Sequence, residues 1–118
     1  MELYKEFSFE SAHFLPMVEE THKCRNMHGH SYKLTVHLTG NIDERLGWVI
    51  DFNDIKKAVL PLVDMVDHKV LNEIKGLENP TAENLAVWFW QNIKPKLPAL
   101  TKIVIAETAT SGCIYTGQ

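Results

Sequence analysis

The sequence predicts an α+β fold, in which a four-stranded antiparallel sheet carries two helices on one face. Three observations lead to this prediction. Apolar and polar residues alternate in two segments near the start of the chain, residues 3–13 and 30–39. Apolar residues recur at helical spacing between Asp51 and Val66 and again between Thr81 and Pro95. Two short apolar segments, Lys102–Glu107 and Ile114–Thr116, then close the chain, which gives the order ββααββ.

The first two predicted strands carry histidines on their apolar faces. The apolar face of the first comprises Leu3, Phe7 and Phe9. His13 has the same parity, so we expect it on the covered side of the sheet. The apolar face of the second comprises Tyr32, Leu34, Val36 and Leu38. His28 and His30 continue this second face toward the preceding loop.

Both predicted helices begin at residues that cap helices well. Asp51 and Thr81 are the expected N-caps, because their side-chain oxygens can accept the first free backbone N–H groups. Pro61 lies inside the first helix, and we expect it to kink or interrupt that helix. The second helix should end before Pro95. Since a four-stranded sheet leaves two unpaired edges, we also expect edge-to-edge assembly into a larger ring.

Length and composition narrow the class of protein. The 118 residues suit one domain spanning 1–118, and 45% of them are apolar, enough to form a core. The net charge of −3 and the absence of a basic stripe argue against nucleic-acid binding. No apolar run is long enough to span a membrane, and no signal segment is visible. We therefore expect a cytoplasmic protein in which Cys24 and Cys113 stay reduced.

The spacing of His28 and His30 favours a metal site. Side chains two residues apart in a strand point to the same face, and Gly29 separates these two. His13, from the neighbouring strand, would complete three nitrogen ligands around zinc with a fourth position left open, as in catalytic zinc sites. The alternative is that each is a hydrogen-bonded histidine of the core.

Cys24 has two functional interpretations. It could be a fourth ligand that closes a structural zinc site, or a thiolate beside an open site that acts as base or nucleophile. It could also be a small apolar residue in a loop. The spacing does not decide among these. His22, Lys23 and Arg25 form a short basic cluster around it, which could hold phosphates or belong to a solvated loop.

Three further residues are candidates for chemistry. His68, oriented by Asp67, could activate Cys24 or relay a proton if folding or assembly brings them together; otherwise it is a surface cation near a helix end. Glu107 ends the buried face of a strand, where an unpaired carboxylate would be costly. It could accept two parallel N–H bonds from an amino-pyrimidinone edge such as that of a pterin or guanine, or it could pair with a nearby lysine.

At these residues the chain resembles the 6-pyruvoyltetrahydropterin synthase family, and most closely its queuosine-pathway branch, the 6-carboxytetrahydropterin synthases. The resemblance runs nearly end to end. Its motifs are Phe9-Glu10-Ser11-Ala12-His13, Cys24-x₃-His28-Gly29-His30, Gly47-Trp48-Val49-Ile50-Asp51-Phe52, Asp67-His68-Lys69-Val70-Leu71-Asn72, Glu78-Asn79-Pro80-Thr81-Ala82-Glu83-Asn84 and Glu107-Thr108. Any one of these motifs is weak alone, and their ordered combination is specific.

The resemblance implies a T-fold (tunnelling fold), whose sheets join into barrels, usually as a hexamer of two trimers with active sites between subunits. By position, the family's zinc ligands match His13, His28 and His30. Its catalytic cysteine matches Cys24, and its acid–base partners match Asp67 and His68. Its pterin-anchoring carboxylate matches Glu107, and a threonine that lines the pterin pocket matches Thr81.

The resemblance also implies a reaction. The family substrate is 7,8-dihydroneopterin triphosphate, and the queuosine branch converts it to 6-carboxytetrahydropterin with loss of acetaldehyde and triphosphate. The three-residue gap between Cys24 and His28 resembles that branch. The alternatives are a 6-pyruvoyltetrahydropterin synthase, which eliminates triphosphate without breaking the carbon chain, and a non-catalytic zinc- or pterin-binding module.

Overall fold

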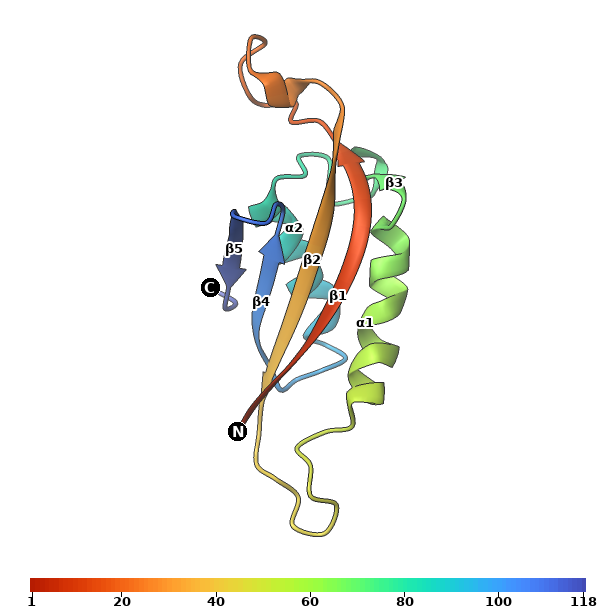
Figure 1. The fold of residues 1–118 in the computed structure, drawn as a ribbon, viewed down its shortest axis with the longest axis vertical. Helices are drawn as coiled ribbons and strands as arrows, with labels where there is room; N and C mark the ends of the chain where they lie inside the picture. Colours follow the sequence, from red (N-terminus) through yellow and green to blue (C-terminus); the bar gives the residue numbers. More distant parts are fainter.

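A computed structural model describes residues 1–118 of the protein. One sheet of five strands, in the order β3-β1-β2-β4-β5, forms its centre (Figure 1). The strands are β1 (Glu2–His13), β2 (His28–Thr39), β3 (Lys69–Val70), β4 (Leu100–Ala106) and β5 (Gly112–Tyr115). The helices are α1 (Phe52–Val66) and α2 (Ala82–Ile93), with short 3-10 turns η1 (Lys23–Arg25) and η2 (Leu71–Glu73).

The prediction of an α+β fold with two helices is confirmed, but the prediction of a four-stranded, purely antiparallel sheet in the order ββααββ is wrong. A fifth strand, β3, lies between the helices in sequence and pairs in parallel with β1, where Ser11 faces Lys69 and Ala12 faces Val70. Only two residues long, β3 cannot show the alternation by which a strand is found in a sequence. The observed order is ββαβαββ.

The long pairing of β1 with β2 fixes the frame of the molecule. These antiparallel strands stay in register from Glu2 opposite Thr39 to His13 opposite His28, with no bulge between. Residues directly opposite each other place their side chains on the same face of the sheet. The predicted alternation of both segments is therefore confirmed, and the register brings the histidines together at one end of the hairpin.

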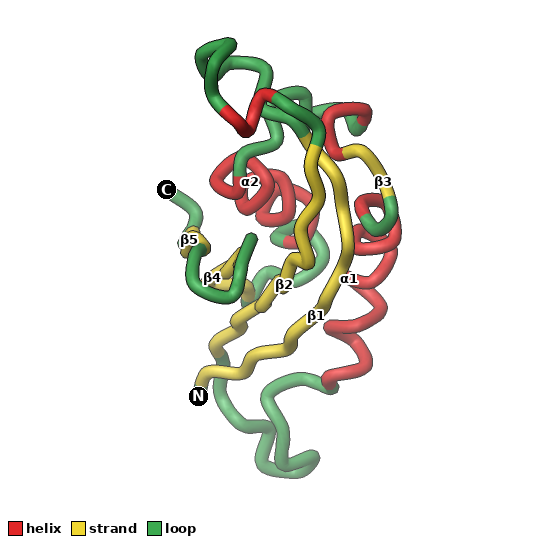
Figure 2. Tube along the Cα trace, turned by 45° about the horizontal axis from the view of Figure 1, so that its top comes forward, coloured by secondary structure: helices red, strands yellow, loops and turns green.

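Both helices cover the same face of the sheet (Figures 1 and 2). The core between the layers contains side chains that are almost completely buried, among them Leu34, Val36, Leu38, Ile55, Val59, Leu85, Phe89, Ile103 and Ile105. The opposite face is polar: Lys33 pairs with Glu6 at 3.7 Å, and Lys102 pairs with Glu2 at 3.7 Å. One face of the sheet is thus sealed by helices, and the other is left charged.

The predicted helix starts are confirmed. A carboxylate oxygen of Asp51 accepts the N–H of Asn53 at 2.9 Å, and the hydroxyl of Thr81 accepts the N–H of Asn84 at 3.1 Å. We expected Pro61 to kink or interrupt the first helix, and the expected interruption is wrong, since α1 runs through Pro61 to Val66. Proline removes one backbone hydrogen bond, while the buried stripe of α1 on either side of it keeps the helix against the sheet.

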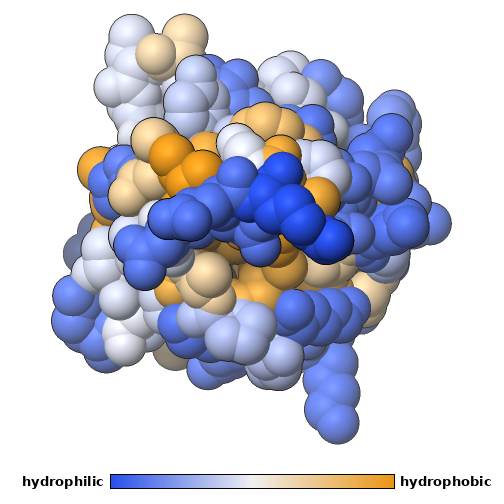
Figure 3. All heavy atoms as spheres, turned by 90° about the horizontal axis from the view of Figure 1, so that it is seen from below, coloured by the Kyte–Doolittle hydropathy of each residue, from blue (hydrophilic) through white to orange (hydrophobic).

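A loop between β2 and α1 projects from one end of the molecule. The carboxylate of Asp43 accepts the N–H groups of Arg45 and Leu46, both at 2.9 Å, and so holds the tip of this loop. Three large apolar side chains stay exposed here, Ile42, Leu46 and Trp48. Seen from this end, apolar and hydrophilic atoms are intermixed (Figure 3). None of the helices has the length and apolar character required to traverse a membrane.

We expect Gly112→Ala to destabilise the protein by about 1–3 kcal/mol, the usual cost of overpacking. A methyl group at Gly112 would overlap the carbonyl oxygen of Ile105, which is a backbone atom of the paired strand β4 and not the end of a flexible side chain. Urea unfolding measures the effect. Thr110→Ala, an exposed substitution in the same turn, is the control. Equal midpoints for both variants would show that the β4–β5 pair is not closely packed.

Candidate active site

Three histidines meet at the end of the β1–β2 hairpin. One ring nitrogen from each of His13, His28 and His30 lies within 4.8 Å of the other two. Their ring centroids are 4.5–5.1 Å apart, and the rings stand steeply tilted to each other rather than stacked. The arrangement follows from the strand register, because His13 sits opposite His28, and His30 is one pleat further along the same face.

Hydrogen bonds set the tautomers of two of these rings. The Nδ1–H of His13 donates to the carbonyl of Pro80 at 2.8 Å, and that of His28 donates to the carbonyl of Asn26 at 2.7 Å. A carbonyl can only accept, so Nδ1 carries the proton and Nε2 keeps its lone pair. Carbonyl partners of this kind are typical of histidines that bind metals through Nε2.

The remaining nitrogens fit a metal ion. The Nε2 atoms of His13 and His30 are buried and make no hydrogen bond. Burial lowers the pKa of His13, which favours the neutral ring that a metal requires. Buried nitrogens without partners are costly in a folded protein, and a bound ion would satisfy them together. Three imidazole nitrogens suit zinc and related transition metals and leave one coordination position open.

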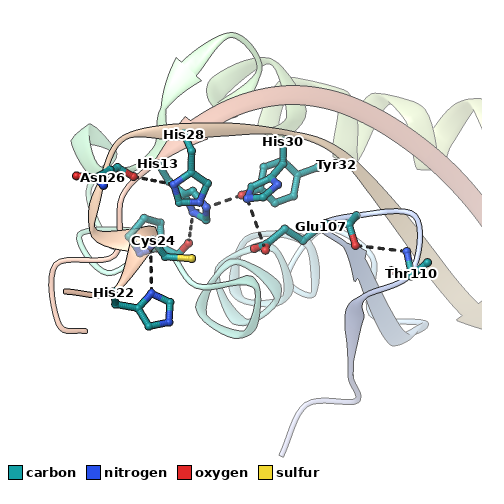
Figure 4. A network of polar contacts seen from close by, with 11 residues as sticks. His13, His22, Cys24, Asn26, His28, His30, Tyr32, Glu107 and Thr110 are labelled. Carbon is teal, nitrogen blue, oxygen red and sulfur yellow. Dashed lines mark hydrogen bonds and ion pairs between the residues drawn. The ribbon is translucent and has the colours of Figure 1, made fainter. Parts of the chain in front are cut away.

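Cys24 lies beside the histidine cluster but not within it. It belongs to η1, where its backbone N–H donates to Nδ1 of His22 at 3.1 Å. Its sulfur is not among the atoms close enough to share an ion with the histidines. A pocket of about 460 Å³ is lined by Lys23, Cys24, His28, His30, Glu107 and Thr108. Figure 4 shows the side chains of Cys24, the three histidines and Glu107 turned toward this common space.

Glu107 links this pocket to a second one. It directly follows β4, and its backbone N–H donates to the carbonyl of Ser111 at 3.0 Å. Its carboxylate is 3.6 Å from Nε2 of His30. A neighbouring pocket of about 370 Å³ is lined by Leu15, Thr81, Ala82, Glu83, Glu107, Ser111, Gly112 and Cys113. Glu107 and Thr81, selected from the sequence, therefore share one cavity next to the histidines.

Tyr32 is a residue of the site that the sequence analysis assigned only to the core. It is 2% exposed, stacks on Phe9 at 5.0 Å and meets the edge of His30 at 5.6 Å. Its hydroxyl lies 3.4 Å from Nδ1 of His13. Burial, helped by the charge of Glu107, raises the pKa of Tyr32, so the phenol keeps its proton. The sequence did contain a signal for this position, because Tyr32 follows His30 by two residues and so lies on the same face of the strand.

Asp67 and His68 form a separate pair at the other side of the hairpin. The Asp67 carboxylate accepts the N–H of Glu10 at 2.9 Å and contacts Nδ1 of His68 at 2.9 Å. The Glu10 N–H, followed by the smaller effect of His68, lowers the pKa of Asp67. His68 has a φ of 57°, and its backbone N–H donates to the carbonyl of Glu10 at 2.6 Å. Its side chain is 78% exposed.

Within a single chain, His68 and Cys24 lie at different places on the sheet. His68 immediately precedes β3 at the sheet edge, whereas the pocket of Cys24 lies beside β2 and the end of β4. The pocket next to His68 is a different one, lined by residues such as Glu10, Ala12 and Ser31, and it shares only His30 with the pocket of Cys24. Folding of a single chain thus does not bring His68 into the pocket of Cys24.

Only one member of the basic cluster faces the Cys24 pocket. The guanidinium of Arg25 donates to the carbonyl of Val18 at 2.7 Å, and His22 is engaged with the backbone of Cys24. These two residues brace the loop between β1 and β2. Lys23 lines the pocket, with its ammonium as the positive charge among the lining side chains.

Comparison with known proteins agrees with this geometry. A family model described as 6-pyruvoyl tetrahydropterin synthase matches residues 2–118. This chain belongs to that family. A 6-carboxy-5,6,7,8-tetrahydropterin synthase from Synechocystis is 40% identical over 96% of this chain and 91% of its own. A dihydroneopterin monophosphate aldolase from Pyrococcus furiosus is 38% identical over 81% of this chain and 77% of its own.

The solved structure of the 6-pyruvoyl tetrahydropterin synthase from Caenorhabditis elegans has the same fold as this family member. It superposes with a TM-score of 0.92 at 28% identity and covers 100% of this chain and 96% of its own. The resemblance inferred from the sequence motifs is thereby confirmed at the level of the family. In this member of the pterin synthase family, His28, His30, Cys24 and Glu107 line one pocket, and His13 completes the histidine cluster beside it.

We expect Asp67→Asn to lower the melting temperature at pH 7 and to lose this effect in acid. Because the folded-state pKa of Asp67 is lowered, its ionised form stabilises the fold fully above the unfolded value of about 3.9. That contribution disappears as the pH falls through the folded pKa. Thermal unfolding from pH 3 to 7 measures it, with Asp64→Asn on the exposed side of α1 as control. A constant difference across this range would contradict a charge effect.

Proposed function

We propose that the protein is a zinc-dependent 6-carboxytetrahydropterin synthase, a carbon–carbon lyase of queuosine biosynthesis that acts in the cytoplasm. It converts 7,8-dihydroneopterin triphosphate to 6-carboxytetrahydropterin with release of acetaldehyde and triphosphate. The observation that carries this proposal is a three-histidine cluster, two members of which share one pocket with Cys24 and Glu107. The identity to the Synechocystis enzyme supports the choice of branch.

Glu107 and Thr81 hold the pterin ring in this proposal. An ionised carboxylate can accept two parallel N–H bonds from the amino-pyrimidinone edge, which fixes both the position and the rotation of the ring. Glu107 stands between the cavity that contains Thr81 and the pocket that contains His30. A ring anchored at Glu107 therefore extends its side chain toward the histidines.

His13, His28 and His30 hold the zinc ion through Nε2. Zinc bound there supplies Lewis-acid chemistry that lowers the pKa of hydroxyl groups on the substrate side chain. The carbonyls of Pro80 and Asn26 keep two of the imidazoles in the tautomer that can bind it. Cys24, next to this open side of the cluster, is the group that moves protons on the side-chain carbons.

The acid–base partner of Cys24 comes from another subunit. Asp67 holds Nδ1 of His68, so Nε2 of this exposed ring is free to meet a thiol on a neighbouring chain. The sheet also presents two unpaired edges, β3 and β5. Pairing these edges would close a ring whose charged inner wall is the uncovered sheet face. We propose the hexamer of two trimers as the assembly that completes each site.

Lys23 is the phosphate-binding residue of the basic cluster in this proposal. Arg25 and His22 already bond to the loop backbone, whereas Lys23 lines the pocket beside Cys24. A substrate anchored at Glu107 and passing the histidines would direct its phosphates toward this end of the pocket. A single ammonium acts as a point charge for such a group.

A 6-pyruvoyltetrahydropterin synthase is the second candidate, supported by the close superposition on the nematode enzyme. The two activities share the ring anchor and the metal and differ in whether the carbon side chain is broken. A non-catalytic zinc- or pterin-binding module is the alternative outside enzymes. It has less support, because the Cys24 sulfur stands apart from the ligand atoms and faces the pocket.

Mass spectrometry of the products distinguishes these functions. Zinc-loaded protein is mixed with 7,8-dihydroneopterin triphosphate, and we expect 6-carboxytetrahydropterin together with acetaldehyde. A pyruvoyl product would assign the sister activity to the same site. Return of unchanged substrate would contradict catalysis and leave a binding module.

We expect Cys24→Ala to lower kcat by at least about 100-fold, the usual contribution of a positioned acid or base, while zinc content and Tm stay at wild-type values. Metal analysis and thermal unfolding accompany the kinetics. Met17→Ala, exposed in the same loop, is the control for loop disturbance. Loss of zinc and stability together would instead identify Cys24 as a structural ligand.

A further inference from the structure

Asn72 ends one of the sequence motifs and has no part in the site described so far. It belongs to η2, which follows β3, and its side chain is half-buried. The preceding Leu71 is fully buried in the core, which fixes the position of η2 against the sheet. From there the amide of Asn72 reaches the backbone of Phe14, 58 residues earlier in the chain. One polar side chain thus joins the end of β1 to the segment that follows α1.

The amide of Asn72 takes the place of a strand partner for Phe14. The N–H of Phe14 donates to Oδ1 of Asn72 at 3.0 Å, and Nδ2 of Asn72 donates to the carbonyl of Phe14 at 2.8 Å. A neighbouring strand would satisfy the same two backbone groups. The strand β3 runs beside β1 only as far as Val70 opposite Ala12 (Figure 1), and Asn72 continues the pairing beyond that point. His13 lies between these two attachments.

The same amide also contacts the loop that holds the ring of His13. Nδ2 of Asn72 donates to the carbonyl of Glu78 in a longer bond of 3.4 Å. An amide nitrogen has two hydrogens, so it can make this bond and the bond to Phe14 together. Two residues after Glu78, the buried Pro80 accepts the Nδ1–H of His13 at 2.8 Å. Asn72 therefore contacts both the backbone beside His13 and the segment that accepts the ring proton.

His13 needs such a link more than His28 does. The ring of His28 bonds to Asn26, two residues away, whereas His13 and Pro80 are 67 residues apart in the chain. An acceptor two residues away is held near its donor by the chain itself. A distant acceptor has to be brought there by contacts between the two segments, and Asn72 makes such contacts within two residues of both partners.

We propose that Asn72 is a positioning residue of the metal centre, which holds the backbone beside His13 and the carbonyl acceptor of its ring in one arrangement. This inference rests on the proposed function, since it takes His13 as a ligand of the metal. A ligand that is held in place before the ion arrives loses less conformational freedom when the ion binds. Asn72 therefore raises the metal affinity through His13, without a contact to the ion.

Asn72→Ala removes these bonds, and we expect the Kd of zinc to rise about tenfold, as for other residues that support metal ligands. Zinc is titrated against a chromophoric chelator, well below the Tm of each variant, so that global stability does not enter the result. The visible spectrum of the Co²⁺-saturated protein, which reports ligand geometry, should also change. Asn92→Ala is the matched control and should keep the wild-type Kd and spectrum, because this half-buried amide donates to the carbonyl of Trp88 at 2.8 Å within α2.

A second variant and a second background sharpen the test. Asn72→Asp keeps the size of the side chain and an acceptor for Phe14, but an ionised carboxylate cannot donate to either carbonyl. It should also weaken zinc binding, and it replaces the alanine variant if that variant does not fold. In His13→Ala protein, removing the Asn72 amide should change the Kd of zinc by less than about twofold, because the ligand through which it acts is gone.

The outcomes separate this role from a general effect on stability. A wild-type Kd of zinc in the Asn72 variants, together with a lowered Tm, would overturn the proposal and leave Asn72 as a residue that only stabilises the fold. Equal losses of zinc affinity in the wild-type and His13→Ala backgrounds would overturn it as well. Failure of the wild-type protein to bind zinc would reject the metal site of the proposed function, and this inference with it.

Discussion

The unbroken register between β1 and β2 is the constraint on which the site depends. It places His13 opposite His28 and leaves His30 one pleat away on the same face. A slip of one residue would turn one histidine set to the opposite face and expose the alternating core residues with it. The hydrophobic alternation that buries Leu34, Val36 and Leu38 therefore also positions the three histidines of the candidate metal site. Core packing and ligand geometry are fixed by the same hydrogen-bonded ladder.

The candidate residues form two groups, one on the helix-covered side of the sheet and one at its β3 edge. The helix-covered side holds Cys24, Glu107 and the histidine cluster in adjoining cavities. The β3 edge holds Asp67 and an exposed His68. The backbone of His68 has a positive φ, which few residues other than glycine adopt. Such a conformation persists only where its surroundings determine it, and here the carbonyl and N–H of Glu10 do so. The two groups of candidate residues thus lie apart on one chain, and for this reason the proposed function includes an assembly that joins them.

Much of the fold and of the histidine cluster was predictable from local patterns in the sequence. Alternation placed His13, His28 and His30 on one face, and capping residues located the starts of both helices. The two-residue strand β3 was not predictable, because its pairing depends on where α1 delivers the chain beside β1. Tyr32 was taken as core because a buried aromatic at an inward position satisfies that pattern fully. Its contact with the ring of His13 becomes visible only in the folded structure, because it joins two strands. The separation of His68 from Cys24 likewise depends on strand order, which sequence spacing does not contain.

X-ray absorption spectroscopy of the zinc-loaded protein tests the central claim most directly, because it reads the atoms around the ion. We expect three imidazole nitrogens at about 2.0–2.1 Å from the zinc and a light-atom fourth ligand. A sulfur neighbour at about 2.3 Å would place Cys24 in the coordination shell and contradict its assignment as a free thiol beside an open metal site.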